Sequence, residues 1–90
     1  MKVFIPSPLQ SYTRQKSEVA AEGTTLEGLL ADLDRRYPGF RFRIVNEQGA
    51  LREHIKLFIN EAQTHDLTHP LQRSDEIHIL CALSGGSDAS

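Results

Sequence analysis

The C-terminal part of the chain reads Ile77-His78-Ile79-Leu80-Cys81-Ala82-Leu83-Ser84-Gly85-Gly86, followed by Ser87-Asp88-Ala89-Ser90. The apolar run over 77–83 predicts a strand. Two glycines after a strand carry no side chain that would block a narrow channel and no Cβ that limits the backbone. The sequence therefore predicts a tail, Ser84-Gly85-Gly86, that can be threaded into another enzyme's active site. If Ser87 to Ser90 were removed, the carboxylate of Gly86 would be its reactive group.

At the other end of the chain, two short stretches predict a hairpin. Residues 1–5 alternate Val3 and Ile5 with Lys2 and Phe4, and residues 17–22 form a second short alternating run. The segment between them, 6–13, contains two prolines, which exclude a continuous strand ladder. We expect this segment to be a loop.

A helix follows the hairpin. The capping-box pattern of Thr24 and Glu27 predicts its start, and Pro38-Gly39 predicts its end. Gly28, inside the helix, indicates either close backbone packing or a tolerated weakness of about 1 kcal/mol relative to alanine, and we favour the second. The apolar stripe has the helical spacing i, i+3, i+4, i+7 and i+11, and consists of Leu26, Leu29, Leu30, Leu33 and Tyr37.

The rest of the chain contains one clear strand and several weaker patterns. Residues 40–45 alternate and predict a short strand or an irregular cover. Residues 55–59 predict a half-buried strand that ends in a turn at Asn60-Glu61. Residues 67–70 are short and irregular, and residues 71–75 predict a polar turn before the last strand.

The order of elements is strand, strand, helix, strand, short strand or loop, and strand. One helix covering one face of a sheet is an α+β arrangement. If the last strand joins the first in parallel at the centre, the fold is the ubiquitin-like β-grasp, a mixed sheet of four to five strands with one main helix.

Composition narrows the possible functions. Ninety residues make one domain that buries roughly 60–65% of its unfolded surface. The net charge of −2 gives no general attraction to nucleic acid or acidic membranes. No run approaches the ~20 apolar residues of a membrane span and the N-terminus lacks a signal-peptide pattern, so the cytoplasm is the expected location. Cys81 is the only cysteine, which excludes an internal disulfide.

Taken together, the chain resembles the ThiS/MoaD family of ubiquitin-like sulfur carriers over nearly all of residues 1–86. Its length and the Ile5-Pro6 opening are more similar to the cysteine-biosynthesis carriers than to the shorter thiamine carriers. Two features differ from the usual pattern: residues 87–90 extend beyond Gly86, and Cys81 stands where relatives often have proline. The matching pieces are Thr24-Thr25-Leu26, Asp32-Leu33, Tyr37-Pro38-Gly39, Ile55-Lys56-Leu57-Phe58-Ile59-Asn60, Asp75-Glu76-Ile77 and Leu83-Ser84-Gly85-Gly86.

The resemblance implies a division into a β-grasp domain, 1–86, and a removable extension, 87–90. It implies that a zinc metalloprotease of the JAMM type trims the extension, and that an E1-like adenylyltransferase then uses ATP and Mg²⁺ to activate Gly86. Sulfur replaces AMP to give a thiocarboxylate, which a sulfur-accepting synthase uses in cysteine, molybdopterin, thiamine or related biosynthesis. The carrier itself is expected to bind no cofactor or metal, to be no enzyme, and to be monomeric when free.

Strand alternation predicts which side chains meet the partners. Phe4, Phe58 and Leu80 are expected on the sheet face away from the helix, as a docking patch. The alternative is that a loop or the 40–45 segment covers them. The residues expected to face the helix are Val3, Ile5, Ile55, Leu57, Ile59, Ile77 and Ile79.

Other patterns carry weaker signals. His65 and His69 have the i, i+4 spacing of a helical metal pair, but Pro70 follows and a third ligand is not evident, so we interpret them as solvated loop residues. Cys81 could accept sulfur, although a packing role is the simpler interpretation. Arg35-Arg36 and the arginines and phenylalanines over 40–43 could contact RNA, but a solvated helix end and strand face fit the acidic balance better.

Two other functions remain compatible with the sequence. The first is ubiquitin-like protein modification, in which Gly86 would be joined to a lysine. The second is a non-catalytic β-grasp interaction module whose Gly-Gly is incidental.

Overall fold

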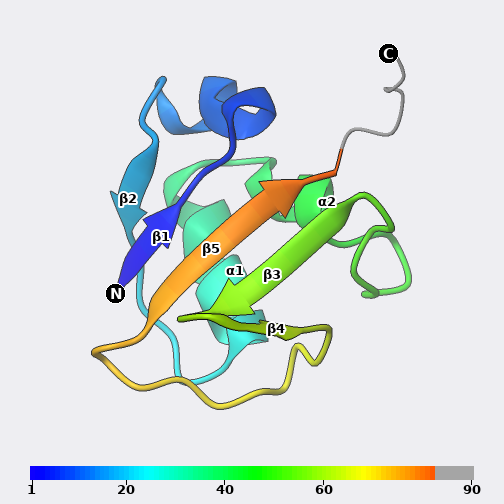
Figure 1. Cartoon of the computed structure of the whole chain (residues 1–90). Helices are drawn as coiled ribbons and strands as arrows, with labels where there is room; N and C mark the ends of the chain where they lie inside the picture. Colours follow the sequence, from blue (N-terminus) through cyan, green and yellow to red (C-terminus); the bar gives the residue numbers. More distant parts are fainter. Residues whose placement is uncertain (83–90) are drawn as a thin grey trace.

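Two strands from opposite ends of the chain, β1 (Lys2–Phe4) and β5 (Glu76–Cys81), pair in parallel at the middle of a five-stranded sheet. The structure is a computed structural model and describes residues 1–82. The other strands are β2 (Glu18–Ala20), β3 (Ile55–Ile59) and β4 (Ala62–Thr64), and all their pairings are antiparallel. The sheet order is β2-β1-β5-β3-β4 (Figure 1). The predicted α+β fold of the ubiquitin-like β-grasp type, with a mixed sheet, is confirmed.

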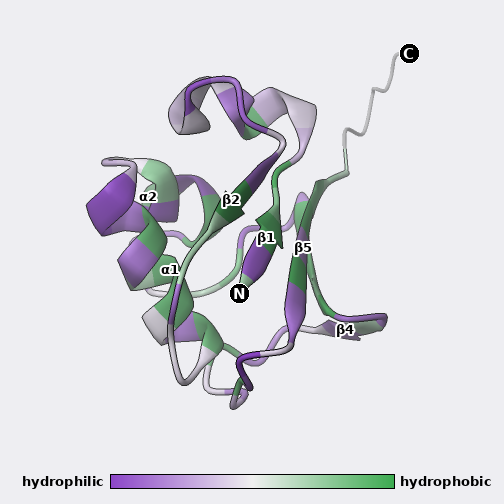
Figure 2. Cartoon of the chain, turned by 90° about the vertical axis from the view of Figure 1, so that its left-hand side faces the viewer, coloured by the Kyte–Doolittle hydropathy of each residue, from purple (hydrophilic) through white to green (hydrophobic). Residues whose placement is uncertain are grey.

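The helices lie on one face of this sheet. The main helix, α1 (Leu26–Arg36), packs across it, and the short helix α2 (Phe40–Ile44) lies beside α1 (Figures 1 and 2). Among residues 1–82, no helix covers the other face of the sheet (Figure 2). No helix in residues 1–82 is both long enough and apolar enough to cross a membrane.

The core lies between α1 and the sheet. All seven strand residues that were predicted to face the helix are at most 7% exposed. Burying each such aliphatic side chain contributes roughly 1.5–3 kcal/mol. The predicted helix stripe is also buried at Leu26, Leu29, Leu30 and Leu33, and Tyr37 is partly buried against the core. Apolar periodicity therefore identified both sides of the core.

The cap of α1 lies one residue later than predicted. Thr25 is the N-cap, and its hydroxyl accepts a hydrogen bond from the Gly28 N–H at 3.1 Å. The predicted capping box of Thr24 and Glu27 is wrong, because the Glu27 carboxylate binds the Arg41 guanidinium at 2.8 Å. Adjacent threonines offer the same hydroxyl, so the local sequence did not decide which of them caps the helix.

Two segments differ from their predicted conformation. Residues 6–13 are not a loop, because Ser7–Thr13 forms a 3-10 helix, η1. Prolines are tolerated in a first helical turn, where the missing N–H has no partner to lose. Its buried residues are Leu9, which belongs to the hydrophobic core, and Thr13, whose hydroxyl donates to the Lys16 carbonyl at 2.8 Å.

Residues 40–44 are α2 rather than a strand or irregular cover. The alternation of apolar residues at 40, 42 and 44 also contains the helical i, i+4 spacing of Phe40 and Ile44, which are both fully buried. Gly39 precedes the helix with a φ of 93°, a conformation that favours glycine. The sequence analysis allowed a short strand or loop before the last strand but did not place it at Ala62–Thr64, where β4 pairs with β3 after the turn at Asn60-Glu61.

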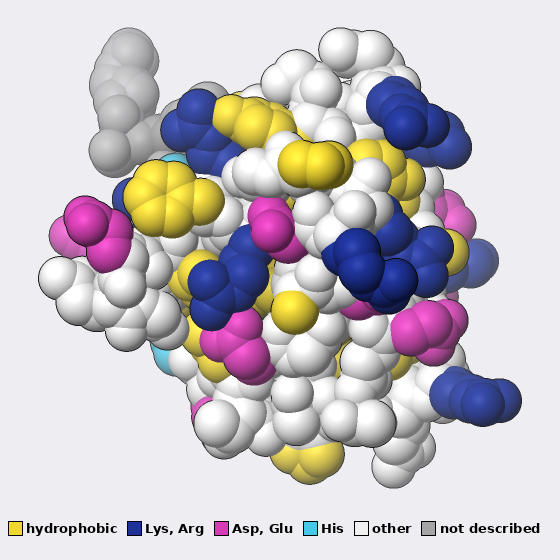
Figure 3. Space-filling view, turned by 180° about the vertical axis from the view of Figure 1, so that it is seen from behind, with side chains coloured by type: hydrophobic (Ala, Val, Ile, Leu, Met, Phe, Trp, Pro, Cys, Tyr) yellow, Lys and Arg dark blue, Asp and Glu magenta, His cyan; other side chains and the backbone are white. Residues whose placement is uncertain are grey.

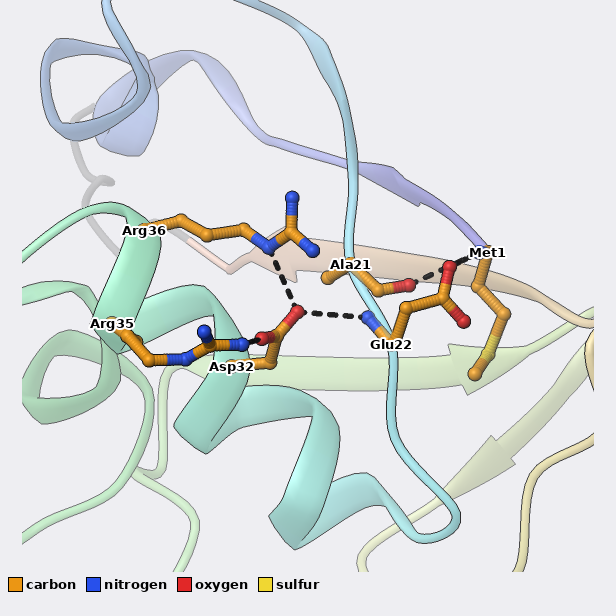
Figure 4. A network of polar contacts seen from close by, with 6 residues as sticks. All are labelled: Met1, Ala21, Glu22, Asp32, Arg35 and Arg36. Carbon is orange, nitrogen blue, oxygen red and sulfur yellow. Dashed lines mark hydrogen bonds and ion pairs between the residues drawn. The ribbon is translucent and has the colours of Figure 1, made fainter.

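One buried carboxylate connects α1 to the strand layer (Figure 4). Asp32 is 7% exposed and accepts a hydrogen bond from the Glu22 backbone N–H at 2.9 Å. It also accepts from Arg36 Nε at 2.8 Å and pairs with Arg35. The Met1 amine donates to the Ala21 carbonyl at 3.0 Å in the same region. These contacts fix the position of the helix relative to the segment after β2.

Candidate functional site

The site begins where β5 ends. β5 pairs with β3 up to Cys81, which lies opposite Ile55, and the Ala82 N–H donates to the His54 carbonyl at 2.7 Å. Ala82 is the last described residue, and this hydrogen bond holds it at the edge of β3. The predicted tail, Ser84-Gly85-Gly86, and the extension 87–90 lie outside the described residues.

The open sheet face leads up to this point. Strand register places His78 opposite Phe4 on one side and opposite Phe58 on the other. The Phe4 and His78 rings stack, with centroids 4.5 Å apart and planes at 12°. Leu80, one pleat closer to the end of β5, is 49% exposed and lies opposite Lys56. The face therefore carries an aromatic row, formed by Phe4, His78 and Phe58, followed by the exposed Leu80.

Phe58 and Leu80 also border a shallow depression on this face. Its volume is about 710 Å³. The other residues that border it are Asn60, Glu61, Glu76 and His78. Phe4 does not line the depression, but it contacts the lining residue His78 through the stack.

The three residues predicted for a docking patch thus share the helix-free face, Phe4 and Phe58 half-buried and Leu80 exposed. The 40–45 segment does not cover them, since α2 lies on the opposite side of the sheet (Figures 1 and 2). His78 is also part of the face, although the sequence analysis did not place it in the docking patch. Its even spacing with Leu80 along β5 is the signal that could have placed it there.

The remaining candidates do not form a site. His65 and His69 are exposed, and neither belongs to a helix. Within residues 1–82 no group of three or more histidine, cysteine or acidic side chains is arranged to hold a metal. Cys81 is partly buried, and burial raises the pKa of its thiol. A raised pKa disfavours the thiolate, which is the reactive form.

The parallel pairing of β1 with the central strand β5, and the packing of one main helix on the sheet, define the class of small ubiquitin-like β-grasp proteins. The chain belongs to the ThiS family, which it matches over residues 3–86. It is thus a ubiquitin-like protein of the sulfur-carrier type.

Individual relatives agree with this assignment. The sulfur carrier protein CysO of Mycobacterium tuberculosis is 28% identical over 89 residues, which covers 93% of this chain and 96% of that protein. The crystal structure of the Amycolatopsis orientalis BexX/CysO complex contains a similar chain, with a TM-score of 0.87, 28% identity and coverage of 94% of this chain and 98% of that one. The small archaeal modifier protein 1 of Methanosarcina acetivorans is also similar, with a TM-score of 0.77, 28% identity and coverage of 94% of both chains.

Proposed function

We propose that this protein carries sulfur as a thiocarboxylate on Gly86 and donates it to a biosynthetic acceptor. Its membership of the ThiS family over residues 3–86 is the observation that supports this most directly. The similarity to CysO favours cysteine biosynthesis among the possible pathways. The protein acts as a substrate of partner enzymes and supplies no acid, base or metal of its own.

The chemistry requires two steps. The Gly86 carboxylate first attacks the α-phosphorus of ATP on an E1-like adenylyltransferase, which forms an acyl-adenylate and releases pyrophosphate, with Mg²⁺ neutralising the phosphate charge. A sulfur nucleophile then attacks the acyl carbon and expels AMP, which leaves the thiocarboxylate. AMP is needed because a carboxylate oxygen is a poor leaving group.

Residues 87–90 must be removed before this chemistry, because Gly86 is otherwise bound as an amide to Ser87. We propose that a JAMM-type metalloprotease cleaves after Gly86 and leaves residues 1–86 as the working domain. The buried core residues of the described part of the chain lie between Val3 and Ile79, all before the proposed cleavage point.

The open sheet face is the proposed docking surface for the adenylyltransferase and, after activation, for the sulfur-accepting synthase. Phe4, Phe58 and Leu80 supply apolar area on that face, and Leu80 lies two residues before Ala82. A partner bound there is therefore close to the point from which the chain continues towards Gly86.

Mass spectrometry tests the proposal directly. The chain ending at Gly86 is incubated with its adenylyltransferase, ATP and a sulfide source. The expected result is a mass gain equal to the replacement of one oxygen by sulfur. The full chain, in which Ser87 blocks Gly86, is the matched control and should not change. A trimmed chain that forms no adenylate and gains no sulfur would contradict the proposal.

Protein modification is the second candidate, because the chain is also similar to the small archaeal modifier protein 1 of Methanosarcina acetivorans. In that function, the activated Gly86 would be transferred to a lysine amine. Peptides that carry a C-terminal fragment of this chain on a lysine would favour this candidate, whereas a thiocarboxylate without such conjugates favours sulfur transfer.

A further inference from the structure

A second exposed hydrophobic group lies away from the open sheet face. In residues 1–82 the two large apolar side chains that are exposed are Leu80, at 49%, and Phe42, at 54%. Phe42 belongs to α2, on the helix side of the sheet (Figure 2). The proposed docking of the open face does not use Phe42.

Arg52 holds Phe42 in a fixed arrangement. Its guanidinium carbon lies over the Phe42 ring, 4.6 Å from the centroid, which is cation–π geometry. Its Nε donates to the Phe42 carbonyl at 2.8 Å. The backbone N–H of Arg52 also donates to the Ile44 carbonyl at 3.0 Å. A planar cation and an aromatic ring are thus presented together as one preorganised unit.

This unit lies at the end of the molecule where β5 finishes. Arg52 is two residues before His54, whose carbonyl accepts the hydrogen bond from Ala82. The Ile55 N–H, at the start of β3, donates to the Arg52 carbonyl at 3.0 Å. Backbone hydrogen bonds therefore connect the Phe42–Arg52 unit to the last placed residue of the chain.

Within the described part of the chain, no acidic side chain neutralises the charge of Arg52. Basic and hydrophobic side chains are interspersed on the helix side of the molecule (Figure 3). Arg35 and Arg36 there pair with Asp32, and Arg41 pairs with Glu27. Arg52 forms no ion pair with any acidic residue in 1–82. A guanidinium that stacks on a ring can still bind a carboxylate through its edge.

The short distance to Gly86 brings this unit close to any partner that acts there. Four residues, 83–86, follow Ala82 up to the proposed reactive carboxyl. At most about 3.6 Å per residue, they span no more than about 14 Å. A catalytic site that reaches Gly86 must lie within that distance of Ala82, so the surrounding surface of the partner comes against this end of the domain.

We propose that Phe42 and Arg52 form a second contact for the adenylyltransferase, whose facing surface carries a carboxylate beside an apolar group. This inference rests on the proposed function and extends the docking surface around the end of β5 from the sheet face to the helix side. The carboxylate would bind the edge of the Arg52 guanidinium while the apolar group packs on the Phe42 ring.

The test is ATP–pyrophosphate exchange by the adenylyltransferase, with the chain ending at Gly86 as the varied substrate. Arg52→Glu should raise KM about tenfold or more, and Phe42→Ala should raise it about threefold to tenfold, both with little change in kcat. Arg52→Lys keeps the charge but loses the planar group and should lie between Arg52→Glu and the unmodified chain. Arg73→Glu is the matched control, because it reverses an exposed charge just before the start of β5, away from Ala82. It should leave KM unchanged.

Several results would overturn the inference. The first is a KM that stays within about twofold of the unmodified chain's value for both Arg52→Glu and Phe42→Ala. The others are a rise in KM for Arg73→Glu as large as that for Arg52→Glu, and a fall in kcat with no change in KM. Far-UV circular dichroism of each variant excludes misfolding as the cause. Self-association or RNA retention that Arg52→Glu abolishes while KM stays unchanged would assign the unit to another partner and also overturn the inference. No exchange with the unmodified trimmed chain would refute the proposed function itself, and the inference with it.

Discussion

The imidazole of His78 stacks on the ring of Phe4, with centroids 4.5 Å apart and planes at 12°. The two residues are 74 positions apart in sequence and meet because β1 and β5 pair in parallel with Phe4 opposite His78. Phe58, in β3, lies opposite His78 on its other side. The same strand pairing that defines the fold thus builds the aromatic row of the proposed docking face.

A charge on that row should weaken partner binding. Phe58→Asp and Leu80→Asp are each expected to reduce affinity for the adenylyltransferase at least about tenfold, because each places a carboxylate in an apolar contact. Isothermal titration calorimetry with the trimmed chain measures the effect. Ala31→Asp, at an exposed position on α1 behind the sheet, is the control and should bind normally. Unchanged affinity in both face variants would reject this face as the docking surface.

Two glycines near the start of α1 should respond in opposite directions to alanine. A Cβ on Gly23 would lie 2.4 Å from the Leu29 backbone nitrogen, so Gly23→Ala must displace backbone and should destabilise by roughly 1–3 kcal/mol. A Cβ on Gly28 meets only the Thr25 hydroxyl at 3.5 Å and the Gly23 Cα at 3.8 Å. Gly28→Ala should therefore stabilise the helix by up to about 1 kcal/mol.

Urea unfolding of the two variants measures both changes in the free energy of unfolding. Gly28→Ala serves as the matched control, because it adds the same methyl group nearby. A stabilised Gly23→Ala variant would contradict the close approach between the segment before α1 and the helix backbone.

The loss of buried polar contacts at Asp32 should also be costly. Asp32→Ala leaves the Glu22 N–H without its acceptor and removes the pairing of Arg35 and Arg36, so we expect a loss of about 2 kcal/mol. Glu47→Ala, which removes an exposed carboxylate, is the comparison. Thermal unfolding should show the larger drop in Tm for Asp32→Ala. Equal drops would mean that the buried network adds little.

Acid should remove the stabilising effect of Asp75. Hydrogen bonds from the Gln72 N–H and the Asn60 side chain lower the pKa of this carboxyl below its ordinary value of 3.8. A carboxyl whose pKa is lower in the folded chain than in the unfolded chain stabilises the fold fully at pH values above the unfolded-state pKa. This stabilisation is lost as the pH falls through the folded-state pKa. Asp75→Ala should therefore be less stable than the unmodified chain near neutral pH, and this difference should shrink below about pH 3.8.

Thermal unfolding of both chains across that pH range measures this dependence. The Asp66 carboxyl provides a parallel case, since hydrogen bonds from Thr68 lower its pKa in the same direction. A stability difference for Asp75→Ala that stays constant down to the most acidic pH would contradict the assignment to a titrating carboxylate.

Cys81 should react slowly with alkylating agents. Burial raises the pKa of its thiol, so less of the reactive thiolate is present near neutral pH. Iodoacetamide labelling of the native chain should be slower than labelling of the same chain unfolded in urea. Cys81→Ala should still accept sulfur at Gly86. A native rate that equals or exceeds the unfolded rate would instead favour a chemical role for the thiol.

Strand alternation and helical spacing were sufficient to predict most of the core residues. Val3, Leu57 and Ile77 were placed correctly because the period of two has only one consistent interpretation there. The 40–44 segment was misassigned because Phe40 and Ile44 satisfy both the strand period and the helical i, i+4 spacing. The choice was made by packing against α1 and η1, which is not encoded locally.

The site could be predicted only in part for a similar reason. The orientation of Phe4, Phe58 and Leu80 follows from their own strands, so local sequence was enough. The stack of Phe4 on His78 and the cation–π pair of Phe42 with Arg52 depend on distant segments meeting in a particular register. Such pairs become visible only when the chain is folded.

The measurement that tests the account most directly is the intact mass of the protein isolated from its own cells. The account predicts a chain that ends at Gly86, part of it carrying sulfur in place of one carboxyl oxygen. A protein that always extends to Ser90, with no sulfur-bearing form under conditions that demand sulfur assimilation, would contradict it.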